Sequence, residues 1–212
     1  MTNTATVCIP WRPAPDRITA YHRVTRFWRS FGYPIVTADS DPDQPFHLAA
    51  ARNNAVLQAD TDVIIVADAD TIGDIAAITH AVDTVTNNVI YPHTQYRHIP
   101  AEYATQPDIL TAPVDRYYVN STGGIIITTL DTYVTLGGMD ERFNPTWGYE
   151  DSAFHLVAQT LSSVKRLEAI VFSFNHHVDN NRDMTDNNPN KARYQLYRAC
   201  VHNPTMMREL LK

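Results

Sequence analysis

The 212-residue sequence lacks the features that mark several large classes of protein. It has only two cysteines, Cys8 and Cys200, so it is not a disulfide-rich secreted domain. Two free buried thiols are the preferred interpretation, and one long-range disulfide is the alternative. No apolar run approaches the roughly 20 residues that span a bilayer, and the N-terminal residues lack the charge and apolar core of a signal peptide. We therefore expect a cytoplasmic protein without a membrane anchor, located in the host cytoplasm if a virus encodes it.

An excess of basic residues is also absent. The net charge is −6 and the sequence pI is about 5.8, which excludes the broad basic surface that drives non-specific nucleic-acid binding. A hydrophobic share of 44% and a charged share of 19% are typical of a folded globular chain. At this length we expect one domain over residues 1–212.

The first half of the chain alternates between two kinds of periodicity. Strand patterns over residues 5–10, 34–38, 63–67 and 89–92 alternate with helical patterns over residues 16–31, 47–59 and 73–85. This order predicts right-handed βαβ units and a mostly parallel sheet. Residues 1–92 are therefore interpreted as a nucleotide-binding half.

The second half is less regular. Residues 91–120 show no clear period and are expected to form long loops around one or two short elements. Beyond them we expect a strand at 123–129, helices at 130–136 and 150–161, a strand or pair of strands within 164–174, and a last helix opening at Pro189.

The strand at residues 63–67 is apolar throughout, which predicts burial on both faces, and it leads into Asp68-Ala69-Asp70. Because side chains alternate along a strand, Asp68 and Asp70 are expected to point the same way, and two adjacent carboxylates persist most easily around a cation. The alternative is that both are turn and cap residues before the next helix. In an open α/β sheet, ligands bind beyond the carboxyl ends of the strands.

Other polar residues lie at predicted strand ends or on the intervening helix. Together they suit a nucleotide diphosphate, with the nucleoside near Asp39, the phosphates near Arg12 and Arg52, and Mn²⁺ or Mg²⁺ at Asp70. The predicted binding set is completed by Pro10, Trp11, Asn53, Asp68 and Ala69.

A second motif lies between the expected helices at 130–136 and 150–161. Residues 137–143 read Gly-Gly-Met-Asp-Glu-Arg-Phe, and residues 147–151 read Trp-Gly-Tyr-Glu-Asp. This segment resembles the acceptor-side segment of GT-A-fold glycosyltransferases of the family 2 type and of the galactosyltransferase and polypeptide N-acetylgalactosaminyltransferase type. Asp68-Ala69-Asp70 resembles their Asp-x-Asp motif. The resemblance implies a GT-A type, Rossmann-like α/β fold with a mostly parallel sheet flanked by helices. It also implies a smaller acceptor-side β element and an acceptor-binding half over residues 93–212.

The resemblance also implies roles for the two acidic motifs. Asp68 would lie by the ribose or a metal-bound water, and Asp70 would ligate the metal. Glu150 would hold a sugar hydroxyl, and Asp151 would be the general base.

Further roles follow for the pocket and the metal. Trp147 and Gly148, with Gly123 and Gly124, would shape the substrate pocket. His176 or His177 would supply a further metal ligand, with His176 favoured. The chain departs from many relatives at Ser173, where they carry a histidine.

The function implied is a metal-dependent, hexosyltransferase-type glycosyltransferase. It would move a sugar from a nucleotide-sugar donor, most simply a UDP-sugar, to a hydroxyl of a glycan, protein, small molecule or modified nucleic acid. Asp151 as base suits an inverting reaction, although retaining relatives carry a similar segment.

Three alternatives use the same residues. A haloacid dehalogenase-type phosphatase also has a strand-end Asp-x-Asp, but usually on the first strand. A nucleotidyltransferase typically has a glycine-rich loop after the first strand, where this chain has Pro-Trp-Arg-Pro-Ala-Pro at residues 10–15. A non-catalytic sugar-nucleotide-binding module would not need Asp151.

Overall fold

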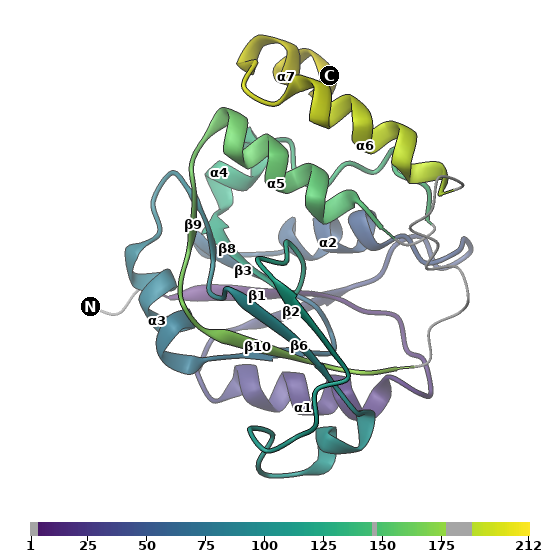
Figure 1. The fold of residues 1–212 in the computed structure, drawn as a ribbon, viewed down its shortest axis with the longest axis vertical. Coiled ribbons are helices and arrows are strands. Elements are labelled where there is room, and N and C mark those ends of the chain that lie inside the picture. Colours follow the sequence, from purple (N-terminus) through teal and green to yellow (C-terminus); the bar gives the residue numbers. More distant parts are fainter. Residues whose placement is uncertain (1–3, 146–147, 177–187) are drawn as a thin grey trace.

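A six-stranded sheet runs through the centre of the molecule, with helices on both faces (Figure 1). The computed structural model describes residues 4–145, 148–176 and 188–212. The strand order is β2-β1-β3-β8-β5-β9, and three of the five pairings are parallel. This confirms the mostly parallel α/β sheet. The strands are β1 (Ala5–Pro10), β2 (Ile35–Ala38), β3 (Val63–Ala67), β5 (Val89–Tyr91), β8 (Ile125–Thr129) and β9 (Val164–Arg166).

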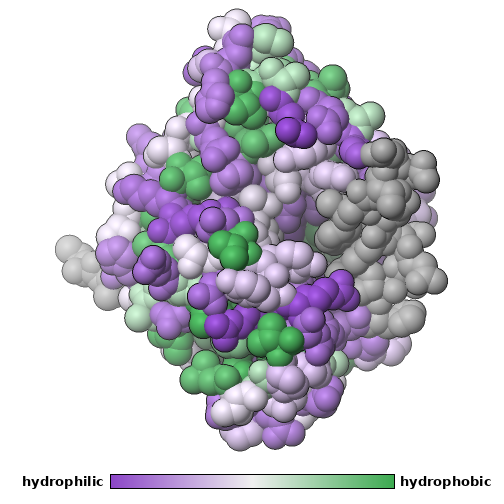
Figure 2. Space-filling model, viewed as in Figure 1, coloured by the Kyte–Doolittle hydropathy of each residue, from purple (hydrophilic) through white to green (hydrophobic). Residues whose placement is uncertain are grey.

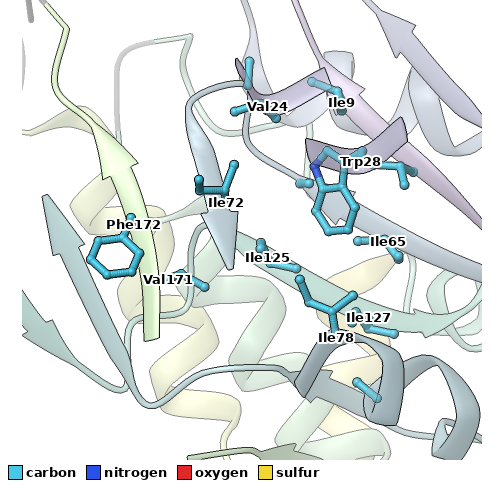
Figure 3. Packing of buried hydrophobic residues seen from close by; sticks show 14 of the residues in the cluster. Ile9, Val24, Trp28, Ile65, Ile72, Ile78, Ile125, Ile127, Val171 and Phe172 are labelled. Atoms are coloured by element: carbon cyan, nitrogen blue, oxygen red, sulfur yellow. The ribbon is translucent and has the colours of Figure 1, made fainter. Parts of the chain in front are cut away.

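The alternation of side chains along the central strands divides the core into two layers. Val7 and Ile65 face one layer with Trp28, whereas Cys8 and Ile64 face the other. Figure 3 shows the first layer from close by, with Trp28 packed among aliphatic side chains of the sheet. This layer lies under α1 (Ile18–Arg29) and α3 (Ile75–Thr84), and the other under α2 (Leu48–Val56), α4 (Leu130–Thr135), α5 (Glu150–Leu161), α6 (Pro189–Cys200) and α7 (Pro204–Leu211).

Both cysteines are free and buried, as the preferred interpretation expected. Burial raises the pKa of the Cys8 thiol to about 12, so this thiol stays protonated and acts as a small apolar core residue. No helix within residues 4–145, 148–176 and 188–212 has the length and apolarity to cross a membrane. On the face shown in Figure 2, hydrophobic residues form separate small patches among hydrophilic ones.

Residues 91–120, expected to form long loops around one or two short elements, instead contain two strands and a 3₁₀ helix, and these strands belong to a second sheet of four strands. Its order is β4-β10-β6-β7, where β4 is Thr71–Gly73, β10 is Ile170–Phe174, β6 is Gln95–Ile99 and β7 is Arg116–Val119. A 3₁₀ helix, η1 (Ala101–Thr105), joins the last two strands. The sequence did not reveal β6 because its polar side chains lack a clear alternation, and its partner β10 lies more than 70 residues away. Strand β4 and helix α7 were also not expected.

Candidate active site

The turn after β3 separates the two acids of the Asp68-Ala69-Asp70 motif. Strand β3 ends at Ala67, and the Asp68 carbonyl accepts a hydrogen bond from the Thr71 amide at 3.2 Å, which closes a tight turn into β4. The two carboxylates follow the strand in this turn, and each has its own cationic partner. Asp68 faces Arg52, whereas Asp70 faces Arg17 and His176. Burial raises the pKa of the Tyr96 hydroxyl, and the charges of both carboxylates add to this shift. A cation shared by Asp68 and Asp70 stays a prediction.

Arg52 links the first acidic motif to the second. Its side chain is 3% exposed, and Nη2 donates to Asp68 Oδ1 at 2.7 Å, while Nη1 lies 3.5 Å from Glu150 Oε1. Burial lowers the pKa of the guanidinium, but the charges of Asp68, Glu150 and Asp151 outweigh it, so the pKa is raised overall. Arg52 is thus a permanent buried cation shared by acids that lie about 80 residues apart in the chain.

Glu150 and Asp151 open helix α5 directly after two residues in left-handed backbone conformations. Gly148 has φ 114° and Tyr149, the N-cap, has φ 77°. Burial and the neighbouring charge of Asp151, opposed by Arg52, raise the pKa of Glu150 to about 7. Burial, opposed by Arg52 and reinforced by Asp68, also raises the pKa of Asp151. A carboxylate with a raised pKa is a better proton acceptor, so Asp151 suits a general base.

The two glycines before β8 fit closely between these acids. A Cβ on Gly123 would lie 2.7 Å from Asp151 Oδ2, and a Cβ on Gly124 would lie 2.5 Å from the Tyr96 ring. The Gly124 amide donates to Asp68 Oδ2 at 3.1 Å. The structure therefore brings the predicted glycines to the two acidic motifs, and side chains larger than hydrogen would clash there.

Asp70 and His176 form the candidate metal-binding pair. His176 Nε2 lies 3.2 Å from Asp70 Oδ2, and the Thr71 hydroxyl donates to Asp70 Oδ1 at 3.1 Å. Burial opposes ionisation of Asp70, but the hydrogen bond from His176 and the charge of Arg17 lower its pKa to about 2. An ionised carboxylate facing an imidazole nitrogen fits a divalent cation that takes its other ligands from a substrate. Within residues 4–145, 148–176 and 188–212, no group of three or more His, Cys, Asp or Glu side chains could hold a metal alone. His177 and Trp147 lie outside the described residues.

Arg17 was not predicted from the sequence. Its Nη2 atom lies 3.5 Å from Asp70 Oδ2 at the start of α1, where it places a positive charge beside the candidate metal pair. Nothing in the local pattern separates it from the other arginines near α1, because its partner is 53 residues away.

Arg12 forms hydrogen bonds to the loop after β2. Arg12 Nε donates to Asp39 Oδ2 at 2.7 Å, Nη1 to the Gln44 carbonyl at 2.8 Å, and Nη2 to the Asp41 carbonyl at 2.8 Å. These bonds order residues 39–44, and the phosphate contact of Arg12 stays a prediction. The nucleoside contact of Asp39 stays a prediction. Beside them, Trp11 stacks on Tyr21 with ring centroids 4.1 Å apart, just after Pro10 ends β1.

The side chain of Asn53 also forms hydrogen bonds within the protein. Its Nδ2 donates to the Met139 carbonyl at 2.8 Å and to Glu141 Oε1 at 2.7 Å, and its Oδ1 accepts from Tyr133 OH at 2.7 Å and the Met139 amide at 3.0 Å. These bonds use both donors and both acceptor positions of the amide. Asn53 thus fixes the Gly-Gly-Met-Asp-Glu segment against α2, and its nucleotide contact stays a prediction.

Known proteins are similar to this chain in sequence over one segment and in fold. A family model described as the N-terminal domain of galactosyltransferase matches residues 112–178, about a third of the chain. Among solved structures, a mutant of Drosophila β1,4-galactosyltransferase 7 in complex with manganese, UDP-Gal and xylobiose superimposes with a TM-score of 0.61 and 16% identity, over 91% of this chain and 79% of that one. The chain has the GT-A fold of glycosyltransferases.

Two further structures agree with this fold. The catalytic domain of Drosophila β1,4-galactosyltransferase 7 with xylobiose gives a TM-score of 0.58 at 17% identity, over 91% of this chain and 79% of that one. GalNAc-T7 with UDP, GalNAc and Mn²⁺ gives 0.53 at 10% identity, over 82% of this chain and 44% of that one. No curated protein sequence matches the chain significantly. Within the GT-A fold, the turn at Asp68–Asp70 and the start of α5 form the candidate active site.

The raised pKa of Glu150 predicts a pH-dependent stability. The native state binds this proton more tightly than the unfolded chain, so the stabilisation is complete below pH 4.5 and is lost as the pH rises towards about 7. Between pH 5 and pH 8, wild type should lose more unfolding free energy than Glu150→Gln, as measured by urea denaturation. Glu168→Gln is the matched control because Glu168 is exposed, and it should follow wild type. Equal pH dependence in all three proteins would contradict the assignment.

Proposed function

We propose that this protein is a metal-dependent glycosyltransferase that moves a sugar from a UDP-sugar to an acceptor hydroxyl. The observation that carries the proposal is the convergence of the two acidic motifs around Arg52, with Asp68 at 2.7 Å and Glu150 at 3.5 Å. The GT-A fold and the galactosyltransferase family model support it. The similar structures hold manganese with UDP-Gal or UDP, which supports a divalent cation and a uridine nucleotide here.

The donor side of the site is built on the turn after β3. Asp70 and His176 would hold the cation, and Asp68 would lie beside it, held in place by Arg52 and the Gly124 amide. When bound, the cation would neutralise negative charge on the departing diphosphate. Arg17 lies next to Asp70 and can donate two parallel hydrogen bonds to a phosphate, a role that the sequence had suggested for Arg12.

The acceptor side is built on the start of α5. Attack by a hydroxyl on the anomeric carbon requires a base to remove its proton, and Asp151 is the residue proposed for this step. Glu150 and Asp151 are adjacent on a helix, so their side chains diverge by about 100°. Glu150 turns towards Arg52 and Asp151 towards Gly123, so the two can act on different atoms. One base opposite one leaving group gives inversion at the anomeric carbon.

The alternative reactions make less use of this geometry. The mechanism of a phosphatase or a nucleotidyltransferase would use the acids after β3 but would give no role to Asp151, which lies beside Gly123. A non-catalytic binding module would bind the nucleotide sugar without turning it over, so an assay for release of UDP in the presence of acceptor separates it from an enzyme.

The metal site is tested with Asp70→Ala. This change removes the carboxylate that faces His176, so manganese-dependent binding of UDP should weaken by roughly 100-fold or more, measured by isothermal titration calorimetry. Asp74→Ala is the matched control, because Asp74 is the N-cap of α3 and its carboxylate accepts from the Ala77 amide. The control should bind UDP like wild type. Unchanged affinity of Asp70→Ala in the presence of manganese would rule out this metal site.

The base is tested with Asp151→Asn, which keeps the shape of the side chain and removes its basicity. We expect turnover to fall roughly 100-fold or more, the usual scale for a lost general base, with UDP binding within about twofold of wild type. Asp131→Asn is the matched control, since Asp131 is an acid in the first turn of α4. NMR of the product should show an inverted anomeric centre. Wild-type turnover by Asp151→Asn, or retention of configuration, would refute the proposed role.

A further inference from the structure

One face of helix α6 contacts the segment that precedes Glu150 and Asp151. Four residues spaced as neighbours on one helical face, at i, i+3, i+4 and i+7, all contact residues 140–149. Arg193 Nε and Tyr197 OH donate to Asp140 Oδ2 at 2.5 and 2.6 Å, and Tyr194 stacks on Tyr149 with ring centroids 4.9 Å apart. The fourth is Asn190, near the start of the helix.

Asn190 forms hydrogen bonds to two residues, Asn144 and Gly148, that lie between Asp140 and α5. The Asn144 amide donates to Asn190 Oδ1 at 2.7 Å, and Asn190 Nδ2 donates to the carbonyls of Asn144 and Gly148, each at 3.2 Å. The side chain is 1% exposed, and its backbone amide donates to Asn188 Oδ1, the cap of the helix. A buried amide with three loop partners fixes the distance between residues 144 and 148.

The backbone next to Asn190 is strained. Gly148 has φ 114°, which glycine tolerates, but Tyr149 has φ 77°, which is costly for a bulky residue. Such conformations persist only where the surrounding structure holds them. Here Asn190 holds the Gly148 carbonyl, and Tyr194 packs on the Tyr149 ring. The next two residues are Glu150 and Asp151, so the angle of Tyr149 sets the direction of both acids.

We propose that Asn190 is a positioning residue that holds Gly148 and Tyr149 in their left-handed conformations and thereby aims Asp151 at the acceptor hydroxyl. This inference rests on the proposed glycosyl transfer for its kinetic consequence. Its structural part, the dependence of the start of α5 on Asn190, does not. A displacement of about 1 Å in a catalytic group can lower turnover by as much as 100-fold.

The test compares Asn190→Ala and the isosteric Asn190→Asp with Asn203→Ala. Asn203 is the N-cap of α7 and accepts from the Met206 amide, so its loss removes a similar hydrogen bond from the same end of the chain. In both Asn190 variants we expect kcat to fall at least about tenfold, with the donor KM within about twofold, whereas Asn203→Ala retains wild-type kcat. If Asn190→Ala fails to fold, Asn190→Asp alone provides the comparison, since its second oxygen would face the Gly148 carbonyl.

A second substitution that restores turnover would distinguish a positioning role of Asn190 from a general loss of stability. Adding Tyr149→Gly to Asn190→Ala relieves the left-handed strain and should recover kcat by at least about threefold. Amide hydrogen exchange over residues 148–152 should be faster in the Asn190 variants than in Asn203→Ala, and this readout needs no enzymatic activity. Equal exchange in the variants, or a kcat in the Asn190 variants that matches Asn203→Ala, would overturn the proposal. An inactive wild type with exchange as expected would instead refute the proposed function alone.

Discussion

The candidate site depends on a single buried cation, Arg52, placed among three acids. Asp68, Glu150 and Asp151 would repel one another strongly in a low-dielectric interior without it. Arg52 lies 2.7 Å from Asp68, and burial raises the pKa values of Glu150 and Asp151 although the charge of Arg52 opposes both shifts. The same cation therefore holds the acids together and leaves one of them basic enough to accept a proton.

The fold delivers these groups from distant parts of the chain. Helix α2 carries Arg52, the turn after β3 carries Asp68, and α5 carries Glu150 and Asp151. Strand β8 runs antiparallel to β3, with Ile125 opposite Ala67, so Gly123 and Gly124 arrive beside the turn at the carboxyl end of β3. The site thus follows the general rule that ligands bind beyond the carboxyl ends of the strands of an open sheet.

Local pattern was enough to predict the parts of the site that depend on neighbours in sequence. The apolar run of β3, the acids that follow it and the acids that open α5 were all recognised from short segments, and the resemblance placed His176 near Asp70. Parts that depend on long-range pairing were missed. The β6–β10 pairing, Arg17 beside Asp70 and the four hydrogen bonds of Asn53 all join residues that no local periodicity relates. The bonds of Arg12 to the Gln44 and Asp41 carbonyls were not predicted, because the sequence around a loop arginine does not indicate which carbonyl groups it will contact.

We propose that the acids around Arg52, with Asp70 and His176, form a metal-dependent site for a nucleotide sugar. The most direct measurement is the thermal unfolding of the wild-type protein with a panel of nucleotide sugars, each with and without manganese. We predict that at least one UDP-sugar raises Tm only when manganese is present, because ligand binding to the native state stabilises it. No shift with any nucleotide sugar in the presence of manganese, or equal shifts without the metal, would show that these residues do not form a metal-dependent nucleotide-sugar site.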